Sequence, residues 1–115
     1  MEKIWNHTFY NELHYAPEEA LGVLITEKSR NPRLSREKMV TIMFETFNVQ
    51  NLYVANEAVM SLYAAGRTTG LICDSGDDAT YATPVFEGFT IPHAVKKMEC
   101  AGRSLTNYMQ KLLLE

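Results

Sequence analysis

The chain has 115 residues, of which 46% are hydrophobic and 22% charged, and its 11 Lys and Arg against 14 Asp and Glu give a net charge of −3. This composition predicts one soluble globular unit over 1–115, long enough to bury a sizeable core. The mild acidity argues against nucleic-acid binding, which needs a clustered cationic face. No apolar run approaches the ~18 residues of a membrane span, and the N-terminus lacks the apolar region of a secretory signal. We therefore expect a cytosolic protein without a membrane partner.

Apolar periodicity predicts a helix followed by a strand at the start of the chain. Trp5, Phe9 and Leu13 recur at every fourth residue and form one helical face, which ends before Pro17. The short apolar run 21–26 is rich in branched residues, and it predicts a strand covered on both faces.

A second helix and strand follow, and then a third helix. Ser35 is expected to cap the second helix. The apolar positions of that helix follow a helical repeat: Met39, Val40, Met43, Phe44 and Phe47. Residues 52–55 predict a buried strand, and the short helix after it is closed by Gly66.

From Gly70 onward the pattern predicts a hairpin and a final helix. Apolar residues 71–73 and 79–86 flank the polar turn 74–78, and a further turn follows at 87–88. The tail from Gly102 carries an apolar stripe at helical spacing: Leu105, Tyr108, Met109, Leu112 and Leu113. The order of the elements predicts a mixed α/β architecture.

The cysteines and histidines carry no recognisable site pattern. Cys73 and Cys100 lack the CxxC spacing, and we expect them to be buried, reduced thiols. His7 and His14 are seven residues apart and His93 is remote, which matches no metal-binding spacing.

The turn 74–78 is the strongest candidate for a binding site, because it places three carboxylates and a glycine between two strands. Successive backbone N–H groups in such a turn bind phosphate oxygens, and a flanking carboxylate orients water around a divalent cation. A plain solvated hairpin tip has the same composition. A serine nucleophile at Ser75 is disfavoured, because the Asp-Ser-Gly context of chymotrypsin-like proteases belongs to a fold of two β-barrels that needs a far longer chain.

Several segments, in order, resemble the actin family. The matching segments include MEKIW (1–5), TFYNEL (8–13), APEE (16–19), REKM (36–39), IMFETFNV (42–49), LYA (62–64), GRTTG (66–70), DSGD (74–77), PHA (92–94) and AGR (101–103). The resemblance implies an α/β, partial actin-like (ribonuclease H-like) ATPase fold, with a mixed sheet, flanking helices and a phosphate-binding hairpin. It covers a central stretch of the family chain: about 1–65 would come from one lobe with the hinge, and about 66–115 from the other.

The resemblance also implies a nucleotide site for ATP with Mg or Ca. Asp74, Ser75, Gly76, Asp77 and Asp78 correspond to the second phosphate-binding loop of the family. Asp74 and Asp77 would lie near the metal and contact it through water. Gly102 corresponds to a residue close to the ribose and adenine, and Arg103 is its matching neighbour in the nucleotide site. The first phosphate loop, most of the adenine pocket and the DNase-binding loop lie outside the matched stretch, so we expect weak ATP binding by these residues alone.

The chain departs from the family where the attacking water is positioned. Glu57 stands in place of a glutamine, Tyr81 in place of a histidine, and Asp78 in place of a glycine in a turn that favours positive φ or close phosphate approach. An ionised Glu57 adds negative charge beside the γ-phosphate, which slows hydrolysis unless the carboxylate acts as a base. The catalytic assignment therefore rests on two divergent residues, Glu57 and Tyr81.

Partner surfaces are implied by the same resemblance. Four residues correspond to part of the cleft used by profilin-like and cofilin-like proteins, or else pack under the hinge: Tyr63, Ala64, Gly66 and Thr68. Residues 85–92 correspond to a loop at filament contacts. Two hypotheses follow: a filament-forming ATPase of the cytoplasmic cytoskeleton, with actin-binding partners, and a non-hydrolysing structural or regulatory relative.

Overall fold

The computed structural model describes residues 1–114 and has the mixed α/β architecture expected from the sequence. Contacts within the chain define two compact units. The first comprises residues 1–27 and 31–55, and the second comprises 28–30 and the chain from 56 onward. The assignment of 1–65 and 66–115 to two lobes stays a prediction.

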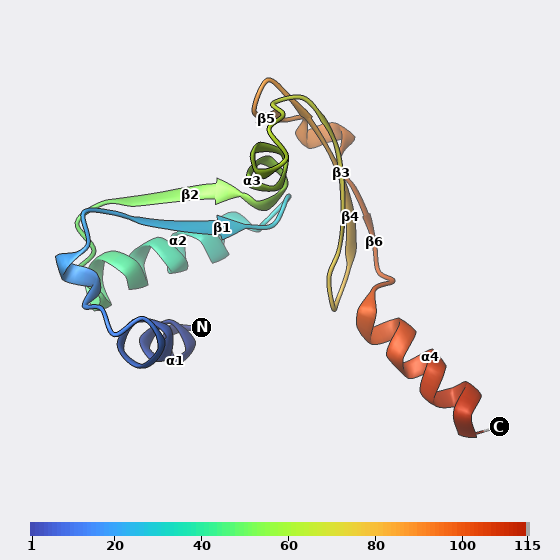
Figure 1. The fold of residues 1–115 in the computed structure, drawn as a ribbon, viewed down its shortest axis with the longest axis horizontal. Coiled ribbons are helices and arrows are strands. Elements are labelled where there is room, and N and C mark those ends of the chain that lie inside the picture. The colour runs from blue at the N-terminus through green and yellow to red at the C-terminus, as the bar shows by residue number, and fades with distance from the viewer. Residues whose placement is uncertain (115) are drawn as a thin grey trace. The chain divides into compact units, whose positions relative to one another are not determined.

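The first unit combines a two-stranded sheet with helices. Its main elements in chain order are α1 (Glu2–His7), β1 (Val23–Glu27), α2 (Arg33–Thr41) and β2 (Leu52–Asn56). α1 and α2 each continue into a short π-helical segment, Thr8–Glu12 and Ile42–Thr46 respectively. Figure 1 shows β1 and β2 side by side and running in the same direction, with α2 as the connection between them.

The core of the first unit forms around two completely buried side chains, Met43 and Phe47. The rings of Phe9 and Phe47 are tilted by 58° with their centroids 5.4 Å apart, within the favourable range for an aromatic pair. The helical face predicted from Trp5 and Phe9 therefore packs on the second helix.

α2 begins three residues earlier than the sequence predicted. Pro32 is its N-cap, and the Pro32 carbonyl accepts hydrogen bonds from the backbone N–H groups of Ser35 at 3.0 Å and Arg36 at 3.2 Å. The prediction that Ser35 caps the helix is wrong, because proline's fixed φ already sets the chain for the first turn. Arg36 also ties the helix to β1 through the buried Glu27 carboxylate, and this hydrogen bond and charge raise the pKa of Arg36.

The second unit is a twisted antiparallel sheet with one helix packed on it and one extending from it. Its elements are α3 (Glu57–Ala64), β3 (Gly70–Ser75), β4 (Thr80–Phe86), β5 (Phe89–Thr90), β6 (Lys96–Met98) and α4 (Gly102–Leu114). β3 pairs along its whole length with β4, and β4 pairs with β5 and β6 on its other side. Pro84 lies between the β5 and β6 pairings, where its missing N–H interrupts no strand ladder.

α3 packs on the sheet through Ala58, Val59 and Leu62, which form the core of the second unit with Val85. The two cysteines lie outside this core: Cys73 and Cys100 are both exposed and unbonded to each other. The prediction of buried thiols is wrong, because β3 alternates its faces along the strand and Cys73 falls on the outer face.

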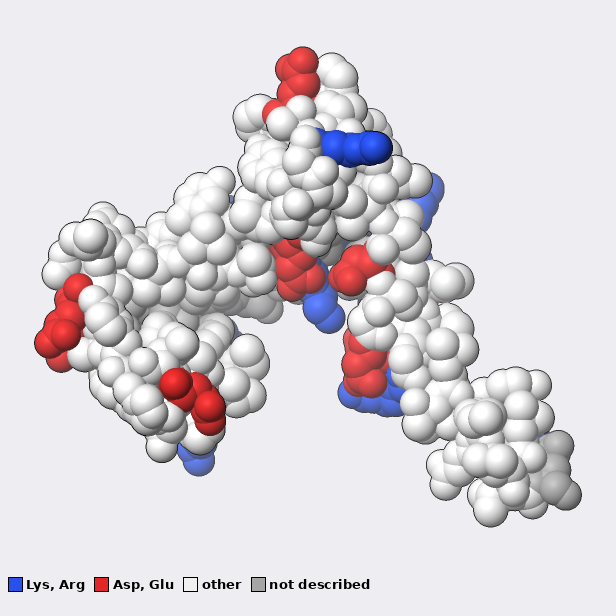
Figure 2. Space-filling model, in the orientation of Figure 1, with Lys and Arg blue, Asp and Glu red and all other residues white. Residues whose placement is uncertain are grey.

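α4 has no buried residue, although its apolar stripe follows the predicted spacing. Figure 2 shows few charged atoms along this helix in the face that it presents. Within the described residues 1–114, no helix has the length and apolar character needed to span a membrane.

Candidate functional site

The tip of the β3–β4 hairpin is built by short polar contacts. Ser75 and Thr80 form the last strand pair, and their side-chain oxygens lie 2.9 Å apart. Because Thr80 donates its hydroxyl proton to the Cys100 carbonyl at 2.7 Å, the Ser75 hydroxyl is the donor within the pair. The backbone N–H of Gly76 donates to the Ala79 carbonyl at 3.3 Å and closes the turn.

The start of α4 is bonded to this tip, although the two lie 26 residues apart in the chain. The backbone N–H groups of Gly102 and Arg103 donate to the carbonyls of Gly76 and Asp77, both at 2.9 Å. The Arg103 guanidinium also pairs with the Asp77 carboxylate at 2.5 Å. A Cβ at position 102 would lie 3.2 Å from the Gly76 carbonyl oxygen, so the close approach favours glycine. The structure thus brings together the two segments to which the family resemblance gave a role in one nucleotide site.

Two backbone N–H groups of the tip are available to a ligand. Within residues 1–114, the N–H groups of Asp77 and Asp78 donate no hydrogen bond, and both residues are exposed. Asp78 adopts a negative φ, so the positive φ considered for this position from the sequence is absent. The replacement of the family glycine by Asp78 therefore acts through charge, because its carboxylate adds negative charge beside these amides.

Glu57, Asp74 and Tyr81 line one small pocket of the second unit. Asp74 and Tyr81 are cross-strand partners in the hairpin, and Glu57 is the first residue of α3. The pocket volume of about 10 Å³ is close to the smallest that holds a water molecule. The two divergent residues named from the sequence therefore lie together, beside a carboxylate of the tip.

Lys28 and Ser29 also line this pocket, and no sequence motif indicates either residue. Ser29 is 7% exposed, and its hydroxyl accepts a hydrogen bond from Thr83 at 2.9 Å. It also contacts the side-chain amide of Asn56, which caps α3 by accepting from the Ala58 N–H at 3.0 Å. Because Ser29 and Thr83 are 54 residues apart, no local pattern could reveal the contact.

In the part of the chain that the structure describes, no cluster of side chains is arranged for direct metal coordination. No group of three or more His, Cys, Asp or Glu side chains in residues 1–114 is placed to hold an ion. Asp74 and Asp77 are both exposed, and Asp77 is paired with Arg103. A contact of Asp74 and Asp77 with a metal through water stays a prediction.

The surface assigned to partners lies at the end of α3 and around the β4–β5 turn. Tyr63, Ala64, Gly66 and Thr68 are exposed, and Gly66 closes the helix with a φ of 70°. The Thr68 carbonyl accepts from the Gly88 N–H at 2.8 Å, which joins the two segments. Gly88 has a φ of 84°, and a Cβ there would collide with the Tyr63 hydroxyl.

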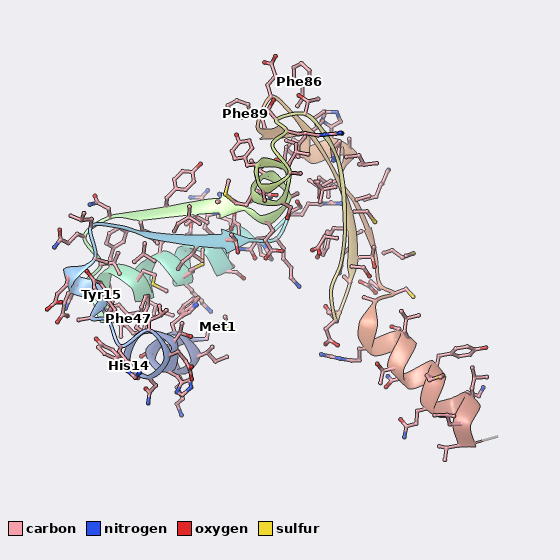
Figure 3. The ribbon with its side chains drawn as sticks, viewed as in Figure 1. Met1, His14, Tyr15, Phe47, Phe86 and Phe89 are labelled. Atoms are coloured by element: carbon pink, nitrogen blue, oxygen red, sulfur yellow. The ribbon has the colours of Figure 1, made fainter. Side chains whose placement is uncertain are left out.

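Two aromatic rings extend from the same turn. Phe86 is 58% exposed and Phe89 is 78% exposed, and Figure 3 shows both side chains projecting outward from the second unit. The two residues are cross-strand partners, so their exposed rings lie next to each other.

Comparison with known protein families gives one match that spans the chain. The sequence model of the family described as Actin matches residues 1–115, which is the entire sequence.

Proposed function

The chain belongs to the actin family, and from this premise we propose that its hairpin tip binds the phosphates of ATP, with Mg or Ca as the accompanying ion. The observation that carries the proposal is the pair of unbonded N–H groups at Asp77 and Asp78, exposed at a tip that the start of α4 holds in place. Successive unbonded backbone N–H groups in a turn can donate to phosphate oxygens. Gly102, bonded to the same tip together with its neighbour Arg103, would lie near the sugar and base.

In this proposal the chain contributes one phosphate loop and the partner surfaces of a cytoplasmic, cytoskeletal ATP-binding protein. The exposed rings of Phe86 and Phe89 support self-assembly into filaments. The exposed end of α3, around Tyr63, supports binding of other actin-binding proteins. Neither nucleic acid nor membrane is a proposed partner.

A second candidate function is favoured by the composition of the water-sized pocket. Glu57 brings a carboxylate to this pocket, and Tyr81 brings a phenol. A carboxylate opposes the negative charge that spreads over the phosphoryl oxygens during transfer. The alternative is therefore a relative that keeps the fold and its surfaces as a structural or regulatory module without hydrolysing ATP.

The phosphate proposal is tested by removing a negative charge at the tip. Asp78→Asn in the 115-residue chain should strengthen binding of Mg·ATP about two- to fivefold, the effect of an exposed charge contact. Saturation-transfer NMR on the nucleotide measures such weak affinities. Glu87→Gln is the matched control, because it removes the same charge from the exposed β4–β5 turn.

The expected result is a stronger affinity in Asp78→Asn alone. Equal affinities in the wild type, Asp78→Asn and Glu87→Gln would place the nucleotide away from the tip and contradict the proposal. So would the absence of any ATP signal for the wild type.

A further inference from the structure

The pocket lined by Glu57 and Tyr81 has an unfavourable charge for a phosphate ligand. Two carboxylates, those of Glu57 and Asp74, line it, and Lys28 is the one basic side chain among its lining residues in the described range 1–114. A phosphate that approaches this pocket meets two like charges, so its binding depends on an offsetting cation.

The backbone at Lys28 is held in place by its neighbour, and its side chain is exposed to solvent. The adjacent Ser29 is buried and bonded to Thr83 and Asn56, which anchors this part of the chain to the second unit. The Lys28 side chain is exposed, and it forms no ion pair with any residue from 1 to 114. An ammonium group on a flexible stem, held at the pocket by its backbone, suits contact with a phosphate oxygen.

We propose that Lys28 binds the terminal phosphate of a nucleoside triphosphate at this pocket. The proposal rests on the proposed function, because it adds a cation to the same site. In this arrangement the amides of Asp77 and Asp78 hold the phosphate chain, while Lys28 offsets the charges of Glu57 and Asp74. Lys28 is thus a phosphate-binding residue.

Arg30 provides a matched control. It carries the same charge on the other side of Ser29 and is also exposed, but it does not line the pocket. A general effect of net charge would appear equally in variants of Lys28 and Arg30, whereas a specific contact would appear only at Lys28.

The test measures Mg·ATP and AMP affinities of the 115-residue chain by saturation-transfer NMR. Lys28→Gln should weaken Mg·ATP binding about fivefold, Lys28→Glu should weaken it further, and Lys28→Arg should keep it within about twofold. AMP binding should be unchanged throughout, because AMP lacks the terminal phosphate. Arg30→Gln should match the wild type for both nucleotides.

The series has two distinct ways to fail. Equal losses in Lys28→Gln and Arg30→Gln, or equal losses for ATP and AMP, would overturn the role of Lys28 while leaving the hairpin proposal standing. Absence of ATP binding by the wild type would overturn the proposed function and this inference with it. Near-UV circular dichroism checks that each variant is folded. If one variant misfolds, the relative ATP affinities of the other Lys28 variants still decide the result.

Discussion

Glu57 and Tyr81 are the two residues on which the question of hydrolysis depends. They line a pocket close to the size of one water molecule, together with Asp74. A residue that orients water without adding charge helps phosphoryl transfer, whereas a carboxylate opposes the charge that the transition state spreads over phosphate oxygens. Glu57 is therefore placed where it could orient a water molecule, but its negative charge would oppose the transition state.

The first prediction concerns these residues in an actin-family chain that also carries the first phosphate loop. Glu57→Gln with Tyr81→His should raise the single-turnover rate of ATP hydrolysis by about tenfold or more, since one such contact contributes on the order of 3 kcal/mol. ATP affinity should change less, because the amides of the tip remain. An unchanged or lower rate would mean that Glu57 is remote from the water or is an effective base.

Lys28 illustrates a kind of site residue that local sequence patterns cannot identify. The turn residues predicted the hairpin, and its flanking apolar strands predicted its pairing, because both signals are local. Lys28 lines the pocket beside Ser29, which contacts Thr83. Ser29 and Thr83 are 54 residues apart, so this contact exists only in the folded chain. The Ser35 prediction failed for a different, local reason, since Pro32 is the N-cap of α2.

Among the secondary-structure elements, β1 and α2 are joined by an ion pair of unequal burial. The Glu27 side chain is 8% exposed and the Arg36 side chain 54%. Asn31 also donates to the Glu27 carboxylate, at 2.9 Å. By contrast, Arg33 and Glu37 pair on the open face of the same helix.

The second prediction compares these two pairs. Arg36→Met should lower the free energy of unfolding by about 2 kcal/mol, because it leaves a buried carboxylate short of partners. Arg33→Met should change it by less than about 0.5 kcal/mol, as expected of an exposed i,i+4 pair. Urea titrations measure both. Equal effects would show that Glu27 is well solvated after Arg36 is lost.

The junction of α4 with the hairpin is the other element contact that matters for function. Gly102→Ala should displace the start of α4, because its Cβ would press on the Gly76 carbonyl oxygen at 3.2 Å. We expect a loss of about 1 kcal/mol in stability, similar to one lost backbone hydrogen bond. Hydrogen exchange at the Gly102 and Arg103 amides checks this, with Ser104→Ala as a control within the same helix. Unchanged protection of the Arg103 amide would contradict it.

For the chain taken entire, the exposed apolar surface is the dominant property. α4 presents Leu105 at 62% exposure and Leu113 at 76%, with no residue of the helix buried. Apolar stripes of this kind on a helix bury themselves against another surface when one is available. The apolar periodicity predicted the helix correctly, but periodicity alone does not say what covers its face.

The fourth prediction follows from this surface. Sedimentation of the 115-residue chain should show self-association, and Leu105→Lys with Leu112→Lys should reduce it. Asn107→Lys, which adds charge to the opposite side of α4, should leave association unchanged. A monodisperse wild-type monomer with a cooperative melt would contradict this prediction and show that the chain folds stably without a partner.

Phosphate binding by the hairpin tip is tested most directly by an NMR titration of the 115-residue chain with Mg·ATP, observing backbone amides. We predict saturable shifts of the Asp77 and Asp78 amides with a dissociation constant weaker than about 1 mM, because one phosphate loop supplies part of the contacts of a nucleotide site. Adenosine, which has no phosphate, should leave these amides unmoved. Shifts confined to other residues, or none at all, would contradict phosphate binding by the hairpin tip, and micromolar affinity would show that this loop needs no second one.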